Sequence, residues 1–174
     1  MRLRHFILSV VCWVAWAAAA PALAGPCYRD AFLVLGAAGD RGQGASGGSS
    51  AAPKELLLTQ QQVLDLPLNS IVTATDWTPE SRFEGPFLKD VVALVATNGT
   101  RLDVRALNDY AASIPWEDMV QFNPILAYKQ NGQQMSRDRF GPLFIVYPRD
   151  SHPALRSPLF SARMVWQVCR IDVR

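Results

Sequence analysis

The chain has 174 residues, of which 49% are hydrophobic and 18% are charged. This length is enough for one domain with a substantial hydrophobic core. Lys and Arg number 17 against 15 Asp and Glu, giving a formal net charge of +2. Such a balance excludes the strongly basic surface typical of nucleic-acid-binding domains, so we expect no nucleic-acid partner.

The first residues have the layout of a cleavable secretory signal. Arg2 and Arg4 precede the uncharged stretch Phe6–Ala20, and small residues, Ala22 and Ala24, follow at the positions that a signal peptidase requires. The apolar stretch is roughly 15 residues long, shorter than the ~20 that span a bilayer as a helix. The alternative is an anchor that stays attached. We expect residues 1–24 to direct export to the periplasm, with no stable membrane insertion after cleavage.

Two cysteines, Cys27 and Cys169, remain once Cys12 leaves with the predicted signal. An oxidising compartment favours a disulfide between them. The alternative is a pair of unbridged, partly buried thiols, because the sequence does not give the distance between the two Cα atoms. With His152 as the remaining histidine, we predict no metal site.

The pattern of apolar residues predicts an N-terminal strand and loop, residues 25–53, before the main domain, residues 54–174. Ala31–Leu35 is a compact apolar run typical of a strand. Residues 36–52 are rich in Gly, Ser and Ala, which indicates a flexible loop. A helix is predicted at Leu58–Leu66, where Thr59 and Gln62 form a capping box.

The rest of the chain is predicted to consist mainly of short strands. Asn131-Gly132 lies between the short segments Ala127–Gln130 and Gln133–Met135 and is typical of a type I′ hairpin turn. The sum is an α+β fold dominated by mixed sheet. The elements expected in chain order are a strand at Ser70–Trp77, a turn-rich excursion at Thr78–Gly85, a helix at Phe87–Ala96, and strands at Arg101–Leu107, Ser113–Trp116, Ile125–Gln130, Pro142–Pro148 and Met164–Val173.

No familiar catalytic pattern is present. The sequence has no HExxH, CxxC or P-loop motif. His152 stands beside Pro153 in a predicted loop, where a solvated side chain is a simpler interpretation than a general base. We therefore predict no catalytic residues.

Several polar and aromatic residues allow two interpretations. Asn108-Asp109-Tyr110 follows a predicted strand, where it forms either a turn or the edge of a ligand site. Arg163 and Trp166 are a surface arginine and a core tryptophan, or two ligand-binding groups. Trp77 ends a predicted strand just before a loop and is either part of the core or a wall for stacking.

Taken together, five segments resemble the molybdopterin-binding domain of the sulfite-oxidase type, and more closely its small, exported, single-domain relatives. The resemblance covers about residues 54–174 and implies a mixed, barrel-like sheet with a few short helices. The segments are Phe83–Val91, Ala106–Tyr110 with Ile114-Pro115, Ile125–Tyr128 with Asn131–Met135, Gly141–Pro148 and Ala162–Trp166.

One departure from the family pattern bears on the cofactor. Catalytic members bind molybdenum through a cysteine in the region that aligns near Thr73–Trp77, and here that region reads Thr-Ala-Thr-Asp-Trp. Thr and Trp do not replace a soft thiolate ligand. The small exported relatives resemble metal-free pterin binders. Some relay pterin occupancy to the periplasmic sensor region of an inner-membrane enzyme that makes or breaks cyclic di-GMP.

The resemblance thus implies a periplasmic protein that binds a reduced, non-metallated pterin and signals to such a partner. The alternative is a molybdopterin-dependent oxidoreductase subunit. A pterin needs an aromatic wall, a carboxylate for its amino edge and donors for its oxo group. We expect the wall from Trp77, Tyr110 or Trp166, the carboxylate from Asp109, and the donors from Asn108 and Arg163.

Overall fold

The computed structural model describes Cys27, residues 31–37 and residues 54–174. The predicted signal segment and positions 38–52 of the predicted flexible loop lie outside the described residues. Within the described part of the chain, no helix is long and apolar enough to cross a membrane.

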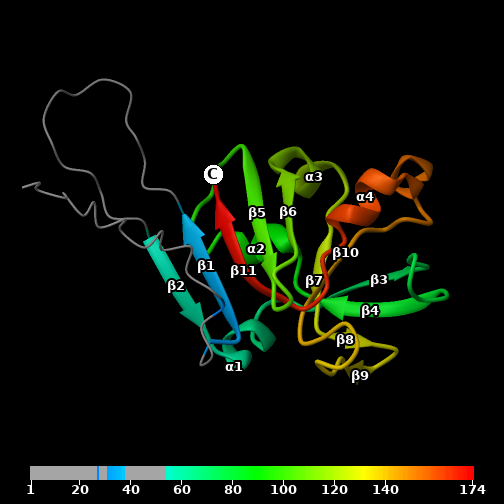
Figure 1. The fold of residues 1–174 in the computed structure, drawn as a ribbon, viewed down its shortest axis with the longest axis horizontal. Coiled ribbons are helices and arrows are strands. Elements are labelled where there is room, and N and C mark those ends of the chain that lie inside the picture. The colour runs from blue at the N-terminus through cyan, green and yellow to red at the C-terminus, as the bar shows by residue number, and fades with distance from the viewer. Residues whose placement is uncertain (1–26, 28–30, 38–53) are drawn as a thin grey trace, which may run out of the picture.

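The larger sheet has five strands in the order β2-β1-β11-β5-β6 (Figure 1). Of its described strand pairs, β1 and β11 run parallel and the others antiparallel. In β5 every second side chain is buried, as the predicted alternation requires. The strands are β1 (Leu33–Ala37), β2 (Lys54–Leu58), β5 (Arg101–Ala106), β6 (Ala111–Pro115) and β11 (Val168–Val173).

A second sheet is built from four strands in the order β3-β4-β8-β9, and β7 pairs separately with β10. In Figure 1, β7 and β10 lie between the two larger sheets. The chain passes from β7 into β8 through Tyr128, whose N–H donates to the Glu84 carbonyl. The strands are β3 (Asn69–Thr73), β4 (Ser81–Gly85), β7 (Ile125–Ala127), β8 (Lys129–Gln130), β9 (Gln133–Gln134) and β10 (Phe144–Val146).

The helices are short. The predicted capping box is confirmed, since the Thr59 hydroxyl accepts from the Gln62 N–H and the Gln62 side chain accepts from the Thr59 N–H at 2.8 Å. The helices are α1 (Gln60–Leu64), α2 (Leu88–Val92), α3 (Trp116–Gln121) and α4 (Pro158–Arg163), with a 3-10 turn, η1, at Pro153–Arg156. The first two end earlier than predicted.

Several predicted boundaries were wrong. The excursion at Thr78–Gly85 contains β4, in which buried and less buried side chains alternate. The strand predicted at Met164–Val173 begins at Val168, because the chain turns just before it, where Gln167 has a φ of 57°. The Asn131-Gly132 hairpin is confirmed, with φ values of 52° and 79° at the two turn residues.

The α+β prediction is confirmed, and both sheets contribute to one continuous apolar core. Of the two alternatives for the cysteines, the structure has the disulfide. Cys27 and Cys169 are bridged, with their Cα atoms 5.3 Å apart. The bridge links Cys27, which precedes β1, to Cys169 in β11. Strand β11 pairs in parallel with β1.

Candidate ligand-binding pocket

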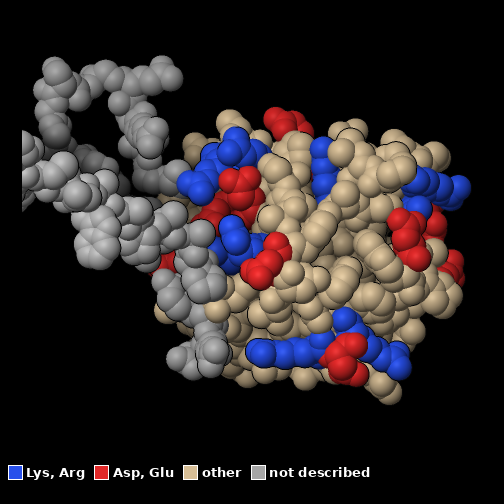
Figure 2. Space-filling view, in the orientation of Figure 1, with Lys and Arg blue, Asp and Glu red and all other residues tan. Residues whose placement is uncertain are grey.

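A pocket of about 300 Å³ lies where three segments meet. These segments are the loop after β3, the turn between β5 and β6, and α4 with the residues that follow it. In Figure 2 charged side chains gather over β1, β11 and β5 and along the lower edge, whereas the middle of the face is uncharged. The pocket is lined by Trp77, Asn108, Tyr110, Ser161, Ala162, Met164 and Trp166.

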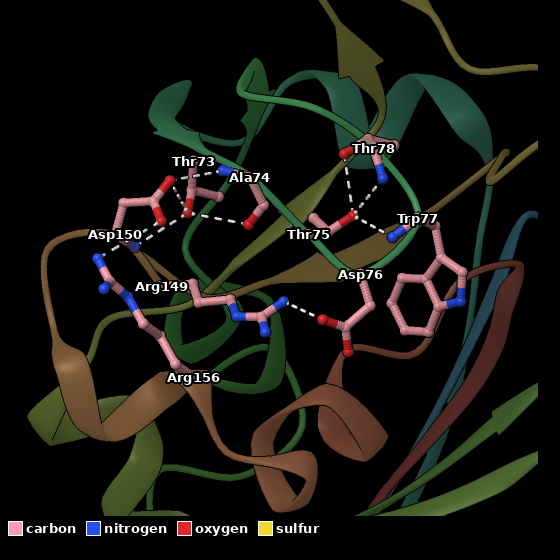
Figure 3. Close-up of polar contacts among 9 residues, drawn as sticks. All are labelled: Thr73, Ala74, Thr75, Asp76, Trp77, Thr78, Arg149, Asp150 and Arg156. Carbon is pink, nitrogen blue, oxygen red and sulfur yellow. Dashed lines mark hydrogen bonds and ion pairs between the residues drawn. The ribbon is translucent and has the colours of Figure 1, made fainter.

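The loop that carries Trp77 is held by hydrogen bonds to Thr75 (Figure 3). The Thr75 hydroxyl accepts from the N–H groups of Trp77 at 3.1 Å and Thr78 at 3.0 Å. Both threonine side chains are buried, and their hydroxyls lie 2.9 Å apart. Trp77 itself is 45% exposed and packs edge-on against Phe144, with ring centroids 6.1 Å apart. The loop therefore fixes an indole whose remaining surface is open to a ligand.

The base of this loop is tied to the segment after β10. The Asp150 carboxylate accepts from the Ala74 N–H at 2.6 Å and from the Thr73 hydroxyl at 3.2 Å. The Asp150 N–H donates back to the Thr73 hydroxyl at 3.1 Å. Hydrogen bonds of this kind to a carboxylate are stronger than neutral ones. These hydrogen bonds fix the base of the loop against the segment that follows β10.

Asp76, next to Trp77, is a site residue that the sequence reasoning missed. It forms an ion pair with Arg149. Hydrogen bonding from the Ser161 hydroxyl, and then from the Arg149 guanidinium, lowers the pKa of the Asp76 carboxyl. Because Asp76 directly precedes Trp77, which lines the pocket, this places an ionised carboxylate next to one of the pocket walls. The one signal in the sequence was its position beside a candidate stacking tryptophan.

The β5–β6 turn brings Asn108 and Tyr110 to the pocket, whereas Asp109 between them does not line it. The Tyr110 N–H donates to the Asn108 side-chain oxygen at 3.1 Å, and the Tyr110 hydroxyl donates to the Ala162 carbonyl at 2.9 Å. Asp109 sits at the turn with a φ of 65°; its side chain is exposed and is not among the lining residues.

Arg163 lies behind the pocket wall. Its Nη1 donates to the Asp118 carboxylate at 2.9 Å, and its guanidinium lies over the Phe160 ring at 5.0 Å. The Tyr147 hydroxyl donates to the same carboxylate oxygen at 2.8 Å. Burial and the Asp118 charge raise the pKa of Tyr147, so it stays a neutral donor. The predicted ligand donor is thus engaged in holding α4 to α3.

A second hollow, of about 360 Å³, lies over β5, β6 and β11. Its charges are largely paired. Arg174 bonds Asp103 at 3.2 Å, and Asp172 receives two hydrogen bonds from Arg170 at 2.7 Å. The residues described as lining it include no aromatic side chain. The pocket beside Trp77 is therefore the better candidate for binding a flat, uncharged ligand.

Comparison with known proteins defines the class of this chain. Residues 59–151 match the model of the oxidoreductase molybdopterin binding domain. That is more than half of the chain, and the chain belongs to this family. Membership implies binding of a pterin-type cofactor. No curated protein matches the chain.

Among solved structures, the sulfane dehydrogenase SoxCD from Paracoccus pantotrophus has a similar fold. The TM-score is 0.53 over 69% of this chain, at 15% sequence identity. This chain corresponds to 35% of the matched one, well under two thirds of its length. The likeness shows the sulfite-oxidase-type fold that the sequence predicted.

The described residues fit the pterin part of such a cofactor better than its metal. The pocket offers aromatic walls, an amide and a nearby carboxylate. Cys27 and Cys169 are bridged to one another, so neither supplies a thiolate. Within residues 54–174 and the other described positions, no group of three or more His, Cys, Asp or Glu is arranged to hold a metal ion. Residues 73–77, at the pocket, contain no cysteine.

Proposed function

We propose that this protein is an exported, periplasmic pterin-binding protein that relays ligand occupancy to a membrane-bound signalling partner, an enzyme that makes or breaks cyclic di-GMP. The observation that carries the binding proposal is the pocket between Trp77, Tyr110 and Trp166. It lies beside the loop that the family resemblance aligns with the metal-ligand segment of catalytic members. Three aromatic side chains around one hollow suit a flat bicyclic ring.

The size and charge of the pocket favour a small pterin without phosphate. A volume of about 300 Å³ is at the lower end for ligand sites, which suits a bicycle rather than a dinucleotide. The described residues that line the pocket are all uncharged. A phosphate group would instead call for Arg or Lys within hydrogen-bonding reach.

The relay is supported by where the pocket opens and by the resemblance. Trp77 and Tyr110 are 45% and 44% exposed, so a stacked ligand changes the surface that they present. A partner that touches this rim distinguishes the bound from the free protein by its different affinity for the two states. The predicted signal peptide supports a periplasmic location, and the cyclic di-GMP partner rests on the resemblance to the small exported relatives.

A molybdopterin-dependent oxidoreductase subunit is the second candidate, favoured by the family itself. Metal analysis of protein purified from the periplasm separates the two. We expect an extractable, fluorescent pterin and no stoichiometric molybdenum. Molybdenum at one atom per chain would overturn the proposal.

Pterin binding itself is tested by titration with the purified mature protein. We expect Trp77→Ala to weaken pterin affinity by about 10- to 100-fold, because stacking on an aromatic ring contributes ~1–3 kcal/mol. The control is Val120→Ala, which shortens a side chain that is 72% exposed and outside the pocket. Equal affinities in the wild type and the Trp77 variant would contradict the site.

The relay is tested in cells. We expect deletion of the protein to change the cellular level of cyclic di-GMP, Trp77→Ala to reproduce that change, and Val120→Ala to have no effect. A cyclic di-GMP level that does not respond to the deletion would reject the signalling role while leaving pterin binding intact.

A further inference from the structure

The pocket edge carries a carboxylate beside an exposed aromatic face. Asp76 and Trp77 are consecutive, and Figure 3 shows their side chains leaving the loop on the same side. The Asp76 side chain is 42% exposed, so a ligand stacked on the indole has access to it. The rigid turn built on Thr75 fixes the backbone of both residues.

Arg149 keeps the Asp76 carboxylate charged but takes up only part of the carboxylate's capacity to accept hydrogen bonds. An ionised carboxylate has about four lone-pair positions on its two oxygens. Arg149 bonds to Oδ1. Even with the Ser161 hydroxyl that lowers the pKa of Asp76, acceptor positions remain for a ligand. A charged acceptor of this kind favours N–H donors and repels carbonyl oxygens.

The β5–β6 turn offers donors to the same pocket. Asn108 accepts the Tyr110 N–H with its side-chain oxygen, which leaves the two hydrogens of its amide group for a ligand. No other hydrogen bond of the Asn108 side chain is found among the described residues. The pocket therefore presents a donor from the β5–β6 turn and has an acceptor beside it on the Trp77 loop.

We propose that Asp76 is a specificity-determining residue, which makes the pocket select 2-amino-4-oxopteridines over 2,4-dioxopteridines. The inference rests on the proposed pterin-binding function and deepens it. A pterin presents its 2-amino group and adjacent ring N–H to the carboxylate, whereas a lumazine keeps that ring N–H but places a carbonyl oxygen where the amino group would be. A site whose polar group is left unpaired by the wrong ligand discriminates strongly against that ligand.

The experiment compares pterin and lumazine, two bicycles of nearly equal size, by fluorescence titration at neutral pH. We expect the wild-type mature protein to bind pterin about 10- to 100-fold more tightly than lumazine. Asp76→Asn replaces a charged acceptor by a group that both donates and accepts, so the ratio should fall to within about threefold of unity. Glu80→Gln, a matched change of an exposed carboxylate on the same loop, should keep the wild-type ratio.

The outcomes separate this inference from the function on which it rests. If the wild type binds both pteridines with equal affinity, or if Asp76→Asn keeps the wild-type ratio, Asp76 is not the selective group and the pterin-binding proposal survives. If the wild type binds neither compound, the binding proposal fails and this inference fails with it. The wild-type ratio needs no variant, so it tests the inference even if a substitution impairs folding.

Discussion

Arg163 and Asp118 form a buried ion pair whose role differs from the one expected for Arg163. The side chains are 15% and 8% exposed, and the Tyr147 hydroxyl completes the group. Arg163 Nε is buried and has no hydrogen-bond partner among the described residues. The pair joins α4 to α3, and α4 carries Ser161 and Ala162 to the pocket. Arg163 is therefore a positioning residue for the pocket wall.

Removal of this guanidinium should destabilise the protein strongly. Arg163→Ala leaves the Asp118 carboxylate buried without its cation, which costs about 3–5 kcal/mol. Urea denaturation measures the loss. The control is Arg156→Ala, since that side chain is 59% exposed and its nitrogen lies 4.0 Å from the Asp150 carboxylate; such exposed pairs contribute under about 1 kcal/mol. Similar losses in both variants would contradict the anchoring role.

Local sequence context indicated part of the candidate pocket. Trp77, Asn108, Tyr110 and Trp166 were all predicted as candidates, and the structure brings them to one pocket. Ser161 was not predicted, because its relevance depends on the packing of α4 beside the β3–β4 loop. No pattern within a few residues of Ser161 indicates that contact.

The close approach of β4 to β7 depends on the absence of a side chain at Gly85. This glycine ends β4, where the strand passes close to β7 and the Leu126 N–H donates to the Pro86 carbonyl. A Cβ atom on Gly85 would lie 2.1 Å from the Leu126 carbonyl oxygen and 2.7 Å from the Ala127 Cα atom. Both are backbone atoms, which cannot rotate away as a side chain does.

We expect Gly85→Ala to cost about 3 kcal/mol, since overpacking a backbone contact forces the two strands apart. Gly132→Ala is the matched control. Nothing lies within 4 Å of a Cβ atom there, and its φ of 79° adds only the strain of a left-handed residue, about 1–2 kcal/mol. Thermal and urea unfolding of the two variants give the comparison. A smaller loss at Gly85 than at Gly132 would contradict the close approach of β4 and β7.

The elements that the sequence predicted best have local causes. The α1 cap and the Asn131-Gly132 hairpin each depend on side chains and φ values within a few residues. β4 was missed because its Pro- and Gly-rich surroundings resemble a turn, whereas its alternation of buried and exposed residues follows from pairing with β3. Strand pairing is a long-range event that short windows do not contain.

On the scale of the whole molecule, the Cys27–Cys169 disulfide closes most of the described chain, with a sequence separation of 142. A loop of this length restricts the unfolded chain severely, so loss of the bridge should cost about 2–5 kcal/mol. We expect a reductant to lower the Tm of the wild-type mature protein, and Cys27→Ser with Cys169→Ser to remove that response. A Tm that is insensitive to the reductant would argue against a stabilising bridge.

The sequence by itself determined the α+β class, the family resemblance, the cap of α1, the hairpin and the aromatic residues of the pocket. The tertiary structure decided that the two cysteines meet, that Arg163 holds α4 to Asp118, and that Asp76 beside Trp77 pairs with Arg149. The physical reason is how far apart in the sequence the interacting residues lie. Caps, turns and alternation are set by neighbouring residues, whereas the pocket exists because two sheets bury their apolar faces together and thereby bring distant loops into contact.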